Sequence, residues 1–134
     1  MTILDSDIII GFFRNMKKAV KFIDNLVQEK TILKTTIFNV AELYKGAYLS
    51  SKVEENLIQI EDFLQNLIII DFTLADVLIY AKISAKLKNK GENIGILDEL
   101  IASIAINNNE TIITRNIAHY KRIPQISYKN WDQL

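Results

Sequence analysis

Four short runs of β-branched and other aliphatic residues, separated by longer segments with a helical period, constrain the fold of this chain most strongly. Continuous apolar runs of this length are typical of strands that are covered on both faces. Strands that alternate with helices pair in parallel and leave helices on both sides of the sheet. The sequence therefore predicts an α/β fold around a mostly parallel sheet. The four predicted strands are Thr2–Leu4, Thr31–Leu33, Leu67–Ile70 and Thr111–Ile113.

Two of the intervening segments carry helical stripes of apolar residues, which predict the faces that pack on the core. Thr73 with Asp76 three residues later predicts a helix N-cap, and Gly91 predicts the end of the same helix. No repeat, low-complexity tract or Pro/Gly linker divides residues 1–134, so we expect a single domain. The stripes are Ile37, Val40, Ala41, Tyr44, Ala47 and Tyr48 in one segment, and Leu74, Val77, Leu78, Ala81 and Ala85 in the other.

The chain has no cysteine and a single histidine, His119, which narrows the chemistry available to it. Thiol nucleophiles, disulfides and cysteine-ligated zinc are excluded, and the absence of cysteine fits a reducing compartment. Paired-histidine acid–base catalysis and His-x-x-x-His zinc sites are excluded too, and a serine triad requires His119. Carboxylates and hydroxyls remain. Carboxylates prefer hard ions such as Mg²⁺ or Mn²⁺.

The charges of the chain balance, with 16 basic and 16 acidic residues, so a nucleic-acid site has to be a local patch. Solvated helix faces account equally well for the basic runs. No apolar run is long enough to span a membrane, and the first residues carry an acid where a signal peptide carries basic residues, so we expect a cytoplasmic protein. The basic runs are Arg14-Lys17-Lys18-Lys21, Lys82-Lys86-Lys88-Lys90 and Arg115-Lys121-Arg122.

Polar residues follow the predicted strands, at the edge where open parallel sheets bind ligands. Asp5 lies between two apolar segments, where a merely solubilising charge is poorly placed, although an N-cap role also explains it. Asp7 is more naturally a cap or first-turn residue, with a supporting or metal-contacting role as the alternative. The full set is Asp5, Asp7, Thr35, Thr36, Asp71 and Asn116.

Asp98 lies at the start of the segment from Ile96 to Asn108, in the first turn of a predicted helix. Its helical neighbours Gly95, Ala102 and Ala105 are small and leave a hollow beside the carboxylate. The helix dipole also favours an acid in the first turn, so capping competes with a functional role. We expect the adjacent Glu99 to turn toward solvent near Ser103.

Periodicity is less favourable to two other candidates. Glu42 shares the side of Asn39 and Gly46, opposite the main apolar stripe, and is predicted to be an exposed glutamate. His119, beside Tyr120, is more typical of a packing or surface histidine.

Taken together and in order, five segments resemble the PIN-domain ribonucleases of the VapC toxin type. The resemblance covers nearly the whole chain, and Gly95–Ala102 is its most specific part. The segments are Ile3–Asp7, Asn39–Leu43, Ile94–Ala102, Thr114–Asn116 and His119–Tyr120.

The resemblance implies a three-layer α/β/α fold with a central, mostly parallel sheet of four to five strands. It also implies a Mg²⁺- or Mn²⁺-dependent endoribonuclease that forms a homodimer and is neutralised by a VapB-like antitoxin. The family's acidic positions fall on Asp5, Glu42 and Asp98. The resemblance therefore makes Glu42 a candidate site residue, although helical periodicity predicts that it is exposed. A fourth position, often aspartate, is Asn116 here, which leaves open whether one metal or two bind.

The remaining site residues are expected to support this centre. We expect Asp5 and Asp98 to ligate the metal, with Glu42 as a further ligand or a base that orients water. Asn116, Thr114 and Asp7 would form a supporting shell, and Asp7 stands where relatives often carry asparagine. Arg14 and Arg115 are expected to contact flanking RNA phosphates.

Two other functions remain open at this point. Asp5-Ser6-Asp7 also resembles the nucleophile loop of haloacid-dehalogenase-type phosphatases, but no late acidic pair follows the last predicted strand, where the chain reads Thr114-Arg115-Asn116. The second alternative is a catalytically inactive interaction module with the same fold. Asn116 favours such a module, and the retained acids argue against it.

Overall fold

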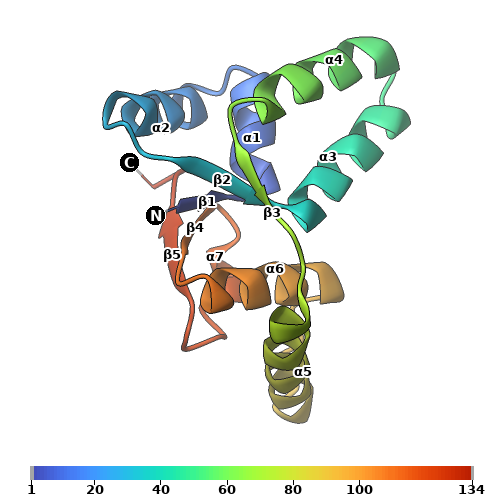
Figure 1. Ribbon diagram of the computed structural model, residues 1–134, viewed down its shortest axis with the longest axis vertical. Helices are drawn as coiled ribbons and strands as arrows, with labels where there is room; N and C mark the ends of the chain where they lie inside the picture. The colour runs from blue at the N-terminus through green and yellow to red at the C-terminus, as the bar shows by residue number, and fades with distance from the viewer. Residues whose placement is uncertain (1, 134) are drawn as a thin grey trace.

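The computed structural model describes residues 2–133, which form one parallel sheet between two layers of helices (Figure 1). The strand order is β3-β2-β1-β4-β5, and each neighbouring pair is parallel. This confirms the predicted α/β/α class. The strands are β1 (Thr2–Leu4), β2 (Leu33–Thr36), β3 (Ile68–Ile70), β4 (Thr111–Thr114) and β5 (Ser127–Asn130). The helices are α1 (Ser6–Phe13), α2 (Lys17–Gln28), α3 (Ile37–Leu49), α4 (Val53–Leu64), α5 (Leu74–Asn89), α6 (Ile96–Asn107) and α7 (Ile117–Tyr120).

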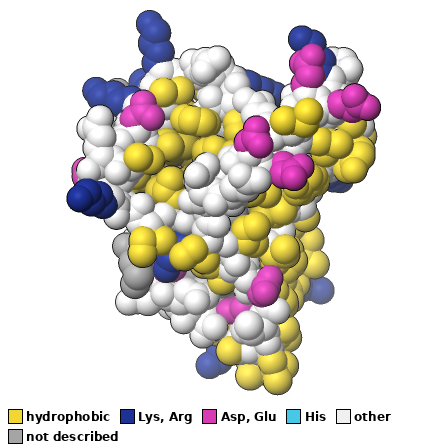
Figure 2. All heavy atoms as spheres, turned by 45° about the horizontal axis from the view of Figure 1, so that its top comes forward, with side chains coloured by type: hydrophobic (Ala, Val, Ile, Leu, Met, Phe, Trp, Pro, Cys, Tyr) yellow, Lys and Arg dark blue, Asp and Glu magenta, His cyan; other side chains and the backbone are white. Residues whose placement is uncertain are grey.

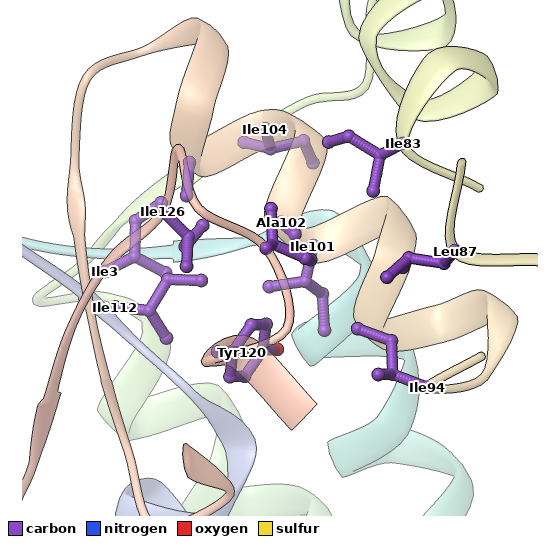
Figure 3. Packing of buried hydrophobic residues seen from close by; sticks show 12 residues of the cluster. Ile3, Ile83, Leu87, Ile94, Ile101, Ala102, Ile104, Ile112, Tyr120 and Ile126 are labelled. Atoms are coloured by element: carbon purple, nitrogen blue, oxygen red, sulfur yellow. The ribbon is translucent and has the colours of Figure 1, made fainter. Parts of the chain in front are cut away.

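The continuous apolar runs are explained by a core on each face of the sheet. Successive strand residues point to opposite faces, so Ile3 and Ile112 pack against α5, α6 and Tyr120 (Figure 3). Their neighbours Leu4 and Ile113 pack instead among α1 to α4. Helices α1 to α4 cover one face of the sheet, and α5 to α7 cover the other (Figure 1).

The order in which strands are added reverses at the centre of the sheet, between β1 and β4, although all the strands are parallel. From β1 the chain moves outward to β2 and β3 on one side, whereas β4 and β5 lie on the other side. Leu4 at the end of β1 is in register with Ile113 in β4. In open α/β sheets, ligands bind beyond the carboxyl ends of the strands at such a switch point. The fold therefore directs attention to Asp5 and to the residues that follow β4.

The predicted strands match the observed ones with three main differences, in the bounds of the second strand, in β5 and in the coverage of β3. The second strand was placed at Thr31–Leu33, but β2 begins at Leu33 and continues to Thr36. Strand β5 was not predicted, since its SYKN sequence has no apolar run. Strand β3 lies at the edge of the sheet, and its Ile68 is 51% exposed, so full coverage of this strand was also wrongly predicted.

The buried face predicted for α5 is wrong, and the one predicted for α3 is confirmed only in part, at buried Ala47 and at Tyr44, which packs against the core. Helix α3 buries Asn39, Leu43 and Ala47, and α5 buries Asp76, Ile83 and Leu87. Much of the predicted stripes lies at the surface. A helical wheel identifies an apolar face but does not say whether that face meets the sheet. The exposed large members of the two stripes are Ile37, Tyr48, Leu74, Val77 and Leu78.

Several local predictions are confirmed. Thr73 and Asp76 form a reciprocal capping box at the start of α5. Gly91 follows the end of this helix with φ of +66°, a conformation that favours glycine.

The prediction that Glu99 turns toward solvent is wrong, because α6 is buried from Glu99 through Ala105 except at Leu100. Within residues 2–133, no helix has both the length and the apolarity needed to cross a membrane.

We predict opposite stability effects for alanine at two helical glycines. A Cβ at Gly11 would lie 3.0 Å from Ala19 Cβ and 3.2 Å from the Trp131 ring, both fully buried, so Gly11→Ala should lower stability by about 1–3 kcal/mol. A Cβ at Gly46 meets nothing within 4 Å, so Gly46→Ala should raise stability by about 0.5–1 kcal/mol. Urea unfolding measures both, and equal effects would contradict the packing described here.

Candidate active site

Asp5 is the buried centre of the site, directly after β1 at the switch point of the sheet. Its backbone N–H donates to Ile113 O at 3.0 Å, and its side chain caps α1 by accepting from Ser6 N at 2.8 Å. The same oxygen, Oδ1, accepts from Asn39 Nδ2 at 2.8 Å, and Oδ2 accepts from Thr114 Oγ1 at 2.8 Å. Asp5 is only 6% exposed. Asp5 therefore both caps α1 and lies at the centre of the candidate site.

Glu42 joins Asp5 through two neutral side chains. Ser6 Oγ donates to Glu42 Oε1 at 2.8 Å, and Asn39 Nδ2 lies 2.9 Å from Ser6 Oγ. Asn39 is held by a capping box with Thr36 at the start of α3. Because this box turns the Asn39 side of α3 toward Asp5, Glu42 is half-buried rather than exposed as predicted from the wheel.

Asp98 lies in the first turn of α6 and is bound by residues that follow β4. Its Oδ2 accepts from Asn116 Nδ2 at 2.9 Å and lies 2.7 Å from His119 Nδ1. The Tyr120 hydroxyl lies 3.5 Å from Oδ1, at the outer limit of a hydrogen bond. His119 was interpreted from sequence as a packing or surface residue, and the structure instead places it in the site. The i, i+3 spacing from Asn116, at a strand end, was the signal that could have identified it.

Thr114 links the two halves of the site. Its hydroxyl lies 2.8 Å from Asp5 Oδ2 and 3.2 Å from Asp7 Oδ2, and its Oγ1 accepts from Asn116 N at 2.9 Å. Through Asn116 this chain of contacts reaches Asp98. Thr114 and Asn116 therefore lie between the acids, and their supporting role stays a prediction.

Asp7 is held by groups from the C-terminal part of the chain. Its Oδ2 accepts from Arg115 N at 2.9 Å, and its Oδ1 accepts from Trp131 Nε1 at 2.8 Å. The Arg115 guanidinium lies 5.2 Å from the centre of the Trp131 ring, within range of a cation–π contact. Trp131 is fully buried and was missed from sequence, since nothing near it resembled a functional motif.

The carboxylates are close enough to perturb one another. Burial raises the pKa of Asp5 to about 7, and the charges of Asp7 and Asp98 add to this rise, against the lowering effect of hydrogen bonds from Thr114 and Ser6. Burial and the charge of Asp98 also raise the pKa of Glu42. Burial and the carboxylates together raise the pKa of Tyr120. We call Asp5, Asp7, Glu42 and Asp98 the acidic rim.

The donor set of the acidic rim fits a hard divalent cation. Among residues 2–133, no three acidic or histidine side chains converge into a ready-made ligand set. Ser6, Asn39 and Thr114 lie between the carboxylates. Mg²⁺ usually keeps several waters and is held by one or two carboxylates, so a complete protein cage is not required. Burial is the main cause of the raised pKa values of Asp5 and Glu42, and the neighbouring carboxylates add to it, so a bound cation would favour the ionised forms of both.

Other candidates differ in their position relative to the rim. Exposed Arg14 lines the same cavity of about 240 Å³ as Glu42, and exposed Arg115 lies beside Asp7. Asp71 is exposed beyond β3, and no contact ties it to the rim among the residues described. Thr35 is buried and donates to Leu4 O at 2.8 Å, which is a structural role.

A parallel α/β sheet with an acidic rim at its switch point is the arrangement found in PIN domains, and a family comparison agrees. The model of the PIN domain matches residues 2–124. The chain therefore belongs to the PIN-domain family, and VapC proteins are among its relatives.

Ribonuclease VapC2 of Rickettsia felis is 41% identical over 108 residues, which cover 81% of this chain and 80% of the relative. The tRNA(fMet)-specific endonuclease VapC of Salmonella typhimurium is 27% identical over 128 residues, 96% of each chain. Among solved structures, VapBC2 from Rickettsia felis bound to a promoter DNA fragment has a TM-score of 0.89 at 32% identity, with 98% of each chain covered. VapBC-1 from nontypeable Haemophilus influenzae has a TM-score of 0.88 at 29% identity, also with 98% of each chain covered.

The pKa of Asp5 predicts a pH-dependent cost of folding in the absence of metal. Between its usual value of 3.8 and about 7, folded Asp5 keeps a proton that the unfolded chain releases. This group therefore lowers stability as pH rises through that window, by up to about 1.4 kcal/mol per pH unit. We expect the stability of Asp5→Asn relative to wild type, measured in EDTA, to increase over the same range.

The exposed Asp71 provides a matched control. The stability difference from wild type should change less with pH in Asp71→Asn than in Asp5→Asn, because Asp71 is an exposed acid outside the rim. If the stability difference changes equally with pH in the two variants, ionisation of Asp5 does not destabilise the folded protein, and the prediction is wrong.

Proposed function

We propose that this chain is a Mg²⁺- or Mn²⁺-dependent endoribonuclease that cuts RNA phosphodiester bonds, and the toxin of a type II toxin–antitoxin pair. The observation that carries the proposal is that Asp5, Glu42 and Asp98, from three distant parts of the sequence, belong to one acidic rim. The ribonuclease and endonuclease names of the relatives support it.

We propose a different role for each acidic residue of the rim. Asp5 and Asp98 would hold the cation, which supplies Lewis acidity toward the phosphate and makes an attacking water more acidic. Glu42, which is half-buried with a raised pKa, would accept the proton of that water. The Ser6 hydroxyl orients Glu42 by donating to its Oε1.

Neutral and basic groups complete the proposed mechanism. Asn116 and His119 fix the Asp98 carboxylate through its Oδ2. Asn116 adds no charge at the fourth acidic position, and Asp7 supplies a carboxylate near Asp5 instead. Exposed Arg14 and Arg115 flank the rim, where guanidinium groups would bind neighbouring phosphates.

Membership of the PIN-domain family removes the basis for the phosphatase alternative. The inactive interaction module remains the second candidate, favoured by Asn116. Against it stands the number of acids retained around buried Asp5, whose raised pKa is of the kind that clusters at functional sites. A cytoplasmic location remains a prediction.

We predict that Asp98→Asn lowers cleavage of a mixed RNA pool in Mg²⁺ by at least about a hundredfold, since it removes one cation ligand. The matched control Asp71→Asn changes an exposed acid outside the rim and should cleave RNA at the wild-type rate. Mg²⁺ should also raise the melting temperature of the wild type and of Asp71→Asn more than that of Asp98→Asn. Wild-type cleavage by Asp98→Asn would remove the proposed mechanism, and an inactive wild type would favour the interaction module.

The exposed apolar faces of α3 and α5 support a homodimer. Figure 2 shows hydrophobic side chains along the side of the molecule that carries α3 and down toward α5. Leu49, Leu74 and Leu78 are 78%, 75% and 67% exposed. Contiguous apolar surface of this kind is unusual on a monomer and typical of an interface. We propose that a second copy of the chain covers this face.

A separate groove is available for a VapB-like antitoxin. A cavity of about 780 Å³ is lined by apolar residues of α1, α2, α4 and β3, among them Phe12, Phe13, Val27 and Phe63. The similar VapBC structures are complexes of two proteins, which supports such a partner here. We propose that an apolar segment of the antitoxin occupies this groove.

A pair of lysine substitutions tests which surface carries the dimer. Leu78→Lys places a charge on the α5 face and should convert a dimer to a monomer, measured by light scattering after size exclusion. Val27→Lys changes an exposed residue in the α2 groove and should leave the dimer intact. A dimer lost in Val27→Lys and kept in Leu78→Lys would contradict the assignment.

A further inference from the structure

We propose that a cation-lined cavity between α5, α6 and the segment after α7 is a second RNA-binding site, which holds backbone phosphates of the substrate away from the acidic rim. This inference rests on the proposed ribonuclease function and deepens it. We call this cavity the basic pocket. Its lining consists of Ile79, Lys82, Ile83, Lys86, Leu87, Lys90, Ile106, Arg122, Ile123, Pro124 and Gln125.

The basic pocket brings together two basic runs that are far apart in the sequence. Lys82, Lys86 and Lys90 come from α5 and its C-cap, and Arg122 comes from the segment between α7 and β5. The cavity has a volume of about 370 Å³, and no acidic residue lines it. In a chain with balanced charge, such a cluster is a local positive field that favours an anionic ligand.

The lysines are arranged in a row along one face of α5. Residues four apart on a helix are displaced by about 6 Å along its axis, so three ammonium groups can follow an extended polyanion. All three lysines are exposed, and none forms an ion pair within the described part of the chain. Their attraction for an external anion is therefore not offset by a carboxylate of the same protein.

Arg122 is fixed at the opposite side of the pocket. Its Nη1 donates to Glu92 O at 3.3 Å and to Asn93 O at 3.1 Å. A guanidinium carries five N–H donors, so further donors remain for a phosphate oxygen. Lysines in the last turn of a helix also complement its dipole. That effect accounts for Lys86 in the last turn of α5, but not for Lys82 or for the convergence of the row with an arginine from another segment.

The floor of the pocket is aliphatic and belongs to the core of this layer. Ile83 and Leu87 extend from α5 toward α6, as Figure 3 shows, and Ile123 packs in the same cluster. A rigid floor holds the cationic groups in place, and it can also accept the apolar face of a base. The site combines fixed cations with apolar surface, the two features used for binding single-stranded nucleic acid.

The basic pocket is connected to the acidic rim by two elements. Asp98 lies in the first turn of α6, whereas Ile106 in its last turn lines the pocket, about 12 Å further along the axis. His119 on α7 contacts Asp98, and Arg122 follows only three residues later. An RNA strand that places its scissile phosphate at the rim therefore needs only a few more nucleotides to reach the pocket. This proximity favours RNA over an acidic protein segment as the occupant.

The test compares two triple variants that remove the same charge, each in an Asp98→Asn background that blocks cleavage. K82Q/K86Q/K90Q neutralises the pocket, and K17Q/K21Q/K88Q neutralises three exposed lysines outside it. Fluorescence anisotropy measures the binding of a labelled single-stranded RNA of mixed sequence, about 20 nucleotides long, over a salt series. A labelled polyglutamate peptide serves as the second probe.

We expect the pocket variant to bind RNA at least about tenfold more weakly than the control variant and to have a salt slope smaller by about 2, as the loss of three phosphate contacts predicts. With Asp98 restored, the same lysine changes should raise KM for long RNA and leave kcat unchanged, because they remove binding remote from the reaction.

Equal RNA affinities and salt slopes in the two variants would overturn the proposal. A pocket variant that loses only polyglutamate binding would also overturn it, in favour of an acidic protein segment. The outcome is separable from the proposed nuclease activity. If the protein binds RNA through the pocket but cuts no RNA, the RNA-binding site is supported and the ribonuclease proposal is overturned. If it cuts RNA but binding does not depend on the pocket, the ribonuclease proposal is supported and the pocket proposal is overturned.

Discussion

The arrangement of the candidate site depends on one buried carboxylate, Asp5, at the switch point where the strand order of the sheet reverses. Its two oxygens accept hydrogen bonds from Ser6, Asn39 and Thr114, which belong to α1, α3 and β4. Each donor then contacts another part of the site: Ser6 binds Glu42, and Thr114 leads through Asn116 to Asp98. The same interactions that satisfy Asp5 thus position the other acids. Without these hydrogen bonds, nothing would hold the three carboxylates, which are distant in sequence, close together.

This arrangement concentrates negative charge in a place where burial disfavours it. The pKa of Asp5 rises to about 7, and that of Glu42 rises as well, because each is partly removed from water and faces other carboxylates. Hydrogen bonds from neutral donors reduce this cost but do not cancel it. Residues that destabilise a fold in this way are expected at functional sites. We propose a divalent cation as the partner of the rim and the phosphates of a nucleic acid as the partner of the basic residues around it.

The sequence predicted the layers of the fold well, because continuous apolar runs report burial on both faces of a strand. It also singled out Asp5, which follows a strand, and Asp98, which lies in the first turn of a helix, and their roles in a site stay predictions. It did worse wherever an outcome depended on tertiary contacts. The wheel placed Glu42 at the surface and the Tyr48 side of α3 in the core, since apolar side chains can face a partner surface as well as the sheet. Contacts between distant segments, such as Trp131 with Asp7, leave no periodic signal and could not be predicted.

The central claim is that the acidic rim is a single cation site. The most direct measurement is anomalous diffraction from crystals of the protein grown with Mn²⁺. The account predicts an anomalous peak within ligand distance of Asp5 and Asp98 in the wild type, and no such peak in Asp98→Asn. A wild-type crystal with full Mn²⁺ occupancy elsewhere and none at the rim would contradict it.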